Sequence, residues 1–142
     1  MNLWKLWIAS IRARYCCWCV LARACQHVVM DDNDVPQAPI GEVPATFDDT
    51  VVLLDVREDD EWQRGHAPGA QHIPMGDVPA RMAEIDTEAQ LFVVCHAGGR
   101  SQRVAQYLAR NGFEPVNVTG GMLAWAGAGR PVVTDGGTPG TV

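Results

Sequence analysis

The chain has 142 residues, of which 47% are hydrophobic and 20% are charged, and its formal net charge at pH 7 is −6. This length is typical of one domain that can bury a hydrophobic core. The acidic balance argues against general nucleic-acid binding, which needs a basic surface, so we expect no nucleic-acid partner.

Residues 1–29 differ in composition from the rest of the chain. They contain four basic residues, no acidic residue, three tryptophans and four of the five cysteines. Arginines interrupt the apolar runs, so the segment falls short of the roughly 18–20 uninterrupted apolar residues of a membrane span. It also lacks the apolar core and cleavage site of a signal peptide. A metal site would draw on Cys16, Cys19, Cys25 and His27, but these lack the paired spacing of zinc modules, and we expect no metal.

Two interpretations of residues 1–29 stay open. Their arginines and tryptophans suit an interfacial helix at a membrane surface, although a membrane partner is not the favoured expectation. Alternatively, the segment is not native to the mature protein, because the composition changes sharply to acidic residues directly after Met30, where translation would then begin. Residues 30–40 contain two prolines and little periodicity, which predicts a flexible linker.

Predicted strands and helices alternate through residues 41–134, the expected folded domain. The apolar, β-branched runs are typical of strands buried on both faces of a parallel sheet. Strands are expected at 41–46, 51–56, 70–73, 91–94 and 116–118, and helices at 59–63, 76–85, 101–111 and 122–125. This order predicts an α/β fold whose parallel sheet is covered by helices on both faces. Residues 135–142 are rich in glycine and predict a disordered tail.

Cys95 follows the expected strand 91–94 and precedes a glycine-rich turn and an amphipathic helix. Open α/β sheets bind ligands at this edge, where a helix N-terminus adds unpaired N–H donors and partial positive charge. Such a position, with a nearby cation such as Arg100, lowers a cysteine pKa from about 8.5 to roughly 3.5–7.5, and the thiolate is the reactive form. Gly98 and Gly99 let N–H groups converge on an anion. An inert, buried cysteine is the less favoured alternative.

The loop Cys95-His96-Ala97-Gly98-Gly99-Arg100 resembles the Cys-x-x-Gly-x-Arg active loop of the rhodanese family of sulfurtransferases. Residues 54–74 are similar to the upstream signature of that family, and residues 112–132 are similar to its closing signature. The resemblance covers about residues 41–134 in order. It implies a single-domain protein of rhodanese-like fold with about five parallel strands.

The resemblance further implies a thiosulfate sulfurtransferase-like enzyme in which Cys95 carries sulfur as a persulfide. The expected partners are a small sulfur donor, thiosulfate or a persulfide, and a cyanide or thiol acceptor, with a protein acceptor as an option. The loop N–H groups from His96 to Ser101, together with Arg100, would stabilise charge on the sulfur, and no cofactor would be required. His96 and Ala97 occupy variable positions that would shape access and the choice of acceptor.

Several other residues have expected roles. Asp55 and Arg57 end the strand at 51–56, where Arg57 binds an anionic donor or, as we favour, forms an internal ion pair with Glu58 or Glu61. Ser101 is expected to cap the following helix. We expect His66 and His72 in a structural turn rather than in catalysis. Trp62 and Trp125 are expected in the core or in a pocket wall.

Two alternative functions stay open. Cysteine-dependent phosphatases and arsenate reductases also use a cysteine, an amide loop and an arginine, but they place one residue more between the two than the four that separate Cys95 from Arg100. A non-catalytic binding or redox-sensing module would use the same fold without sulfur transfer. Because residues 41–134 contain a single cysteine, no disulfide framework is expected within them, which suits a reducing compartment and predicts a cytoplasmic protein.

Overall fold

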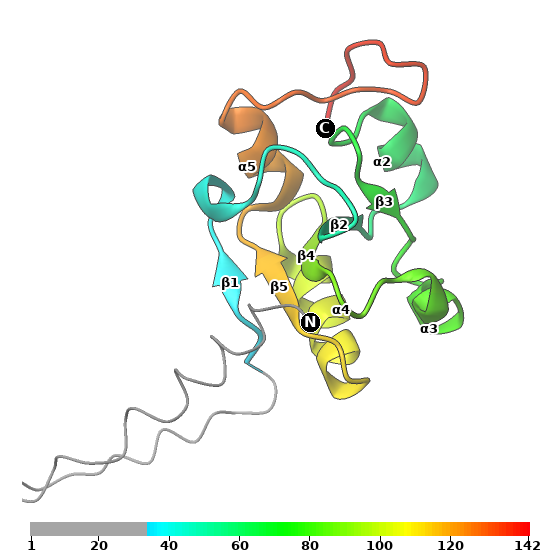
Figure 1. Cartoon of the computed structure of the whole chain (residues 1–142). Coiled ribbons are helices and arrows are strands. Elements are labelled where there is room, and N and C mark those ends of the chain that lie inside the picture. The colour runs from blue at the N-terminus through cyan, green and yellow to red at the C-terminus, as the bar shows by residue number, and fades with distance from the viewer. Residues whose placement is uncertain (1–33) are drawn as a thin grey trace, which may run out of the picture.

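The computed structural model describes residues 34–142 of the chain (Figure 1). The predictions for residues 1–29, including the metal, membrane-surface and non-native alternatives, lie outside the described residues, as does the start of the expected linker. Within residues 34–142, no helix is both long enough and apolar enough to span a bilayer.

In the described part of the chain, five parallel strands form one sheet in the order β1-β5-β4-β2-β3. The three inner strands are β5 (Pro115–Val118), β4 (Gln90–Val94) and β2 (Val51–Asp55), and the edges are the two-residue strands β1 (Gln37–Ala38) and β3 (Gln71–His72). All four strand pairs are parallel, so every carboxyl end lies at the same edge of the sheet. This arrangement confirms the predicted fold class.

Helices cover both faces of the sheet (Figure 1). They are α2 (Asp59–Arg64), α3 (Val78–Arg81), α4 (Gly99–Arg110) and α5 (Gly121–Gly127), with short 3-10 turns η1 (Ile40–Glu42) and η2 (Met82–Glu84). Successive residues of a strand point to opposite faces. One core accordingly joins Leu91 and Val93 to residues of α3 and α4, and a second core joins Phe92 and Val94 to residues of α5. The central strand β4 is therefore buried on both sides, as its apolar run predicts.

The first strand and helix α3 differ from the prediction. β1 lies at Gln37–Ala38, inside the expected linker, because the backbone around it pairs with β5: the Thr119 N–H donates to the Ala38 carbonyl at 2.9 Å. The prolines on either side of it are tolerated because an edge strand pairs on one side only. The helix expected over 76–85 begins only at Val78, with Pro79 in its first turn, where a proline fits. It ends at Arg81 and continues as η2.

The tail expected to be disordered, residues 135–142, is placed against the domain instead. Residues 132–142, which we call the tail segment, begin with an antiparallel bridge between Val133 and His66. The Gly140 N–H donates to the Val132 carbonyl at 2.9 Å, and the Thr141 N–H donates to the Arg64 carbonyl at 2.9 Å. In Figure 1 this segment, coloured orange to red, runs from α5 across to α2. The glycine content that predicts disorder here permits close backbone contact.

Candidate functional site

Cys95 lies at the carboxyl end of β4, at the centre of the sheet, and is a buried, free cysteine. Its Sγ accepts hydrogen bonds from the N–H of Gly98 at 3.1 Å and from the hydroxyl of Ser101 at 3.3 Å. Gly98 has a φ of +105°, in the left-handed region that favours glycine, and forms the N-cap of α4. The turn into α4 therefore folds its donors back onto the sulfur.

Burial and hydrogen bonding act in opposite directions on the Cys95 thiol. Burial raises the pKa, because it penalises the charged thiolate, whereas the Ser101 hydroxyl and the N–H groups of Ser101, Gly98 and Ala97 lower it. The hydrogen bonds outweigh burial, so the pKa of Cys95 lies below its usual value. The loop thus favours the nucleophilic form of a cysteine that is almost completely shielded from solvent.

Ser101 does not cap the helix as expected. α4 begins at Gly99, so Ser101 lies in its first turn and its hydroxyl points back into the loop. The same hydroxyl also donates to the Gly98 carbonyl, at 3.1 Å. A hydroxyl has one proton, and a negatively charged acceptor makes the stronger hydrogen bond. When Cys95 ionises, the Ser101 hydroxyl therefore donates its hydrogen bond to the sulfur rather than to the Gly98 carbonyl.

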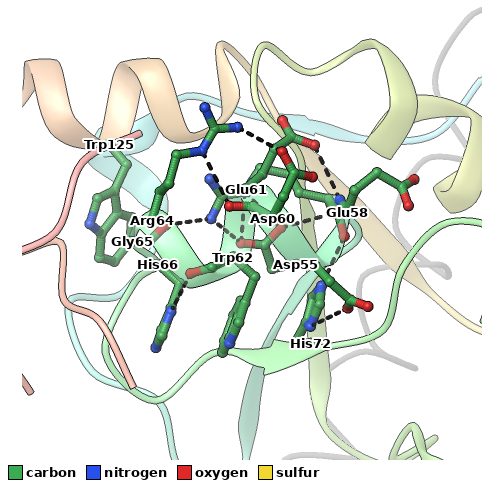
Figure 2. Close-up of polar contacts among 12 residues, drawn as sticks. Asp55, Glu58, Asp60, Glu61, Trp62, Arg64, Gly65, His66, His72 and Trp125 are labelled. Carbon is green, nitrogen blue, oxygen red and sulfur yellow. Dashed lines mark hydrogen bonds and ion pairs between the residues drawn. The ribbon is translucent and has the colours of Figure 1, made fainter. Parts of the chain in front are cut away.

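Arg100 is held beside the loop by Glu61 of α2. Its two terminal nitrogens donate to the two Glu61 carboxylate oxygens at 2.6 and 2.8 Å. These hydrogen bonds lower the pKa of Glu61 to about 2 and raise that of Arg100. Glu61 also accepts the backbone N–H of Glu58 in a capping box at the start of α2 (Figure 2). Sequence reasoning did not assign this role to Glu61, although the Glu-x-x-Glu spacing is a recognisable signal.

Asp55 and Arg57 form a fully buried ion pair at the end of β2. The Arg57 Nη2 lies 2.7 Å from the Asp55 carboxylate, and Nη2 also donates to the Gly65 carbonyl at 2.8 Å. The expectation of an internal ion pair is therefore right, but the named partners are wrong, because the side chain of Arg57 folds back onto Asp55 rather than reaching Glu58 or Glu61. The pair fixes the chain between β2 and the end of α2.

The N-terminus of α5 supports the loop from the other side. The Met122 N–H donates to the Cys95 carbonyl at 2.8 Å, and the Leu123 N–H donates to the His96 carbonyl at 3.1 Å. Gly121 has a φ of +57°, and a Cβ there would overlap the carbonyl oxygens of Cys95 and His96. This contact was missed from the sequence, where the Gly120-Gly121 pair is its only signal.

A small pocket lies beside the loop. It has a volume of about 250 Å³ and is lined by Arg57, Glu61, Arg64, His96 and Val142. His96 is half-buried and Ala97 is exposed, so the two variable positions of the loop lie at its accessible side. Within residues 34–142, no three His, Cys, Asp or Glu side chains are grouped so that they could hold a metal ion.

His66 and His72 contact an aromatic ring and backbone carbonyls near α2. Trp62 lies between them, with ring centroids 3.5 Å from His66 and 4.6 Å from His72 (Figure 2). His66 Nδ1 lies 3.0 Å from the Trp62 carbonyl oxygen, and His72 Nε2 lies 2.8 Å from that of Arg57. Trp125 is buried in the core packed on α5. These residues support α2 and the core rather than the sulfur.

A parallel sheet with a buried cysteine at its carboxyl edge, hydrogen-bonded by the turn into the next helix, defines an α/β protein with a thiolate-stabilising loop. The chain belongs to the rhodanese-like domain family, whose sequence pattern it matches over residues 41–128. The described residues carry both the sheet and the loop, so the predicted rhodanese-like fold is confirmed.

Individual relatives agree with this assignment. The chain is 45% identical over 84 residues to the "Putative sulfurtransferase YtwF" of Bacillus subtilis strain 168, a match that covers 59% of this chain and 82% of that protein. It is 34% identical over 102 residues to a sulfurtransferase of Allochromatium vinosum, a match that covers 71% of this chain and 94% of that protein. The solved structure of a rhodanese-like domain protein from Staphylococcus aureus has a TM-score of 0.52 and 41% identity, covering 53% of this chain and 74% of that one.

Proposed function

We propose that this protein is a sulfurtransferase that takes a sulfane sulfur from thiosulfate or a persulfide, holds it on Cys95, and passes it to cyanide or a thiol. The observation that carries the proposal is the pair of hydrogen bonds to Sγ, from Gly98 at 3.1 Å and Ser101 at 3.3 Å. They stabilise a thiolate in a place where burial alone would suppress it. The sulfurtransferase names of two relatives support the same chemistry.

In the first step, the Cys95 thiolate attacks the outer sulfur of thiosulfate. A bond forms between Sγ and that sulfur, the bond between the two thiosulfate sulfurs breaks, and its electron pair leaves with sulfite. The enzyme then carries a negatively charged persulfide. The N–H groups of the turn into α4 and the nearby charge of Arg100 stabilise the terminal sulfur in the manner of an oxyanion hole.

In the second step, cyanide or a thiolate attacks the outer sulfur of the persulfide. The bond between Sγ and the outer sulfur breaks, and its electron pair returns to Sγ as the thiolate, which restores the starting enzyme. The same donors that lower the pKa of Cys95 make this thiolate a good leaving group. No proton has to be added to Cys95 in either step.

The geometry of Arg100 favours sulfur transfer over phosphate chemistry. Only four residues separate it from Cys95, and its two terminal nitrogens are bound to the Glu61 carboxylate. Bidentate binding of a phosphate would require these same nitrogens. We further propose that the protein acts in the cytoplasm, because a thiolate carrier persists in a reducing compartment.

Intact mass spectrometry tests the proposal. The reduced protein is weighed before and after treatment with thiosulfate or with a persulfide donor, and again after cyanide, next to Cys95→Ser. We expect a gain of one sulfur atom that cyanide removes and that Cys95→Ser does not show. A folded, reduced protein that gains no sulfur from either donor contradicts the proposal. Hydrolysis of a phenyl phosphate would then indicate a phosphatase, and partner binding unchanged in Cys95→Ala a binding module.

A further inference from the structure

One wall of the pocket beside the cysteine loop comes from the tail segment. Of the residues that line this pocket of about 250 Å³, His96 belongs to the loop, Glu61 holds Arg100, and Val142 comes from the tail. A molecule in the pocket therefore lies next to the loop and also contacts the tail segment. The volume is below the roughly 300–1,000 Å³ of pockets that take drug-sized ligands.

The tail segment is fixed to the end of α2 by backbone and side-chain contacts. Val133 and His66 exchange backbone hydrogen bonds of 2.8 and 2.9 Å, and Thr141 donates to the Arg64 carbonyl. The Asp135 carboxylate accepts the Trp62 indole N–H at 3.1 Å and lies 3.6 Å from His66 Nε2. At its end, Val142 packs against the core that contains Trp125. The segment is thus held against the domain near its start, at Val133 and Asp135, and again at its end, at Thr141 and Val142.

Two facing glycines allow this close contact. A Cβ at Gly140 would lie 2.7 Å from both the Arg64 carbonyl oxygen and the Gly65 Cα, and a Cβ at Gly65 would lie 2.6 Å from the Thr141 nitrogen. Real Cβ atoms do not approach backbone atoms this closely, so any larger residue would push the tail segment away from α2. Neither glycine has a φ in the left-handed region, so the requirement is for space alone.

Gly65 at the end of α2 connects the tail segment to the buried ion pair of Asp55 and Arg57. The carbonyl of Gly65, the residue under the tail segment, accepts the hydrogen bond from Arg57 Nη2. Arg57 in turn is bound to Asp55 at the carboxyl end of β2 and lines the pocket. The pocket therefore has a rigid floor at the sheet and a wall whose position depends on the contact between the tail segment and α2.

We propose that the tail segment limits the size of the molecules that reach Cys95, and that Val142 is the side chain that closes the pocket. This inference rests on the proposed function in taking Cys95 as the reacting group. A compact donor or acceptor of a few heavy atoms fits beside the loop. A tripeptide thiol such as glutathione reaches it with its sulfur end only, because the tail segment occupies the space that the rest of the molecule needs.

The test compares the access of compact and bulky reagents to Cys95. Full-length protein is treated with iodoacetamide or with a fluorescein maleimide, and modification of the Cys95 peptide is followed by mass spectrometry, which separates it from the other cysteines. Gly140→Ala displaces the tail segment. The matched control is Gly136→Ala, where an added Cβ meets only the Thr134 hydroxyl at 3.9 Å.

We expect the ratio of the bulky to the compact rate at Cys95 to rise about tenfold in Gly140→Ala, which is the low end of the size discrimination that a binding pocket can provide. The ratio should not change in Gly136→Ala. An unchanged ratio in a folded Gly140→Ala protein overturns the inference. If circular dichroism shows that Gly140→Ala does not fold, Val142→Ala decides, because it removes only the side chain at the pocket. A ratio that rises there supports the inference, and one that stays constant overturns it.

Alkylation does not require sulfur transfer, so the two proposals fail separately. A shifted alkylation ratio in protein that never gains sulfur supports the size limit and contradicts the sulfurtransferase proposal. If thiosulfate loads sulfur onto Cys95 but the tail variants leave the alkylation ratio unchanged, the sulfurtransferase proposal is supported and the size limit is contradicted. If both proposals hold, Gly140→Ala lowers the KM for glutathione persulfide and leaves the KM for thiosulfate near that of the native protein.

Discussion

Replacing Ser101 with alanine removes one hydrogen-bond donor from the Cys95 sulfur and little else. Ser101 is completely buried, and its hydroxyl lies 3.3 Å from Sγ. Alanine keeps the backbone and Cβ in place, so the backbone N–H groups of the loop remain directed at the sulfur. Because the lost donor stabilises the thiolate, its removal raises the pKa of Cys95.

The size of the effect follows from the strength of the lost bond. A hydrogen bond to a charged group contributes about 1.5–3 kcal/mol, and one pKa unit corresponds to about 1.4 kcal/mol. The pKa of Cys95 should therefore rise in Ser101→Ala, because the thiolate loses this stabilisation. At a pH below the pKa of Cys95 in both proteins, the thiolate fraction falls by a factor of about 10–100. The rate of persulfide formation falls by a smaller factor, because a more basic thiolate is a stronger nucleophile.

The measurement is the pH dependence of Cys95 alkylation by iodoacetamide, followed on the Cys95 peptide, because only the thiolate reacts. The control is Thr138→Ala, which removes the hydroxyl that lies 2.7 Å from the Thr134 hydroxyl, in the tail segment. Identical midpoints in native protein and folded Ser101→Ala would refute the reasoning. They would mean that the Ser101 hydroxyl still donates its hydrogen bond to the Gly98 carbonyl when Cys95 ionises.

Three further substitutions test other contacts of the site by urea unfolding. Glu61→Gln should lower the free energy of unfolding by about 1–2 kcal/mol at neutral pH. Since ionised Glu61 stabilises the fold above its ordinary pKa, this difference should vanish as the pH falls from 4.5 to about 2, and a difference that persists there contradicts the pairing. Gly121→Ala should cost about 2 kcal/mol or more, from its positive φ and its overlap with the loop carbonyls. Gly127→Ala, where an added Cβ meets nothing, should stay within about 1 kcal/mol of the native protein. Asp55→Asn leaves Arg57 buried without its carboxylate and should cost about 3–5 kcal/mol, whereas Asp60→Asn, at an exposed pair, should cost less than about 1 kcal/mol. Similar losses for the two aspartates would argue against the buried pair.

The central strand and the loop were predictable because their signals are local. The run 91–94 is continuously apolar, and a strand buried on both faces requires that composition. The glycines after Cys95 and the amphipathic pattern of the next helix lie within one short stretch of sequence. Placement of the cysteine at a helix N-terminus therefore follows without knowledge of any distant contact.

The features that were missed depend on contacts between distant parts of the chain. β1 is two residues long and exists because β5 offers it hydrogen bonds, so its own sequence carries almost no signal. Arg57 has five acidic residues within four positions of it in the sequence, and only the end of β2 decides that it binds Asp55. The composition of the tail segment indicates disorder, because the contact that Gly140 makes with Gly65 across the fold leaves no signal in the local sequence.

The hydrogen bonds from α5 also determine the polarity of the loop. A peptide group is planar and trans, so a carbonyl and the N–H bonded to the same carbon point to opposite sides. Because α5 binds the carbonyls of Cys95 and His96, the N–H groups of His96 and Ala97 are turned away from α5. A substitution that rotates the first turn of α5 could reverse these peptide groups and present carbonyl oxygens to the sulfur. Residues 95–101 would then repel an anion without a single change in their own sequence.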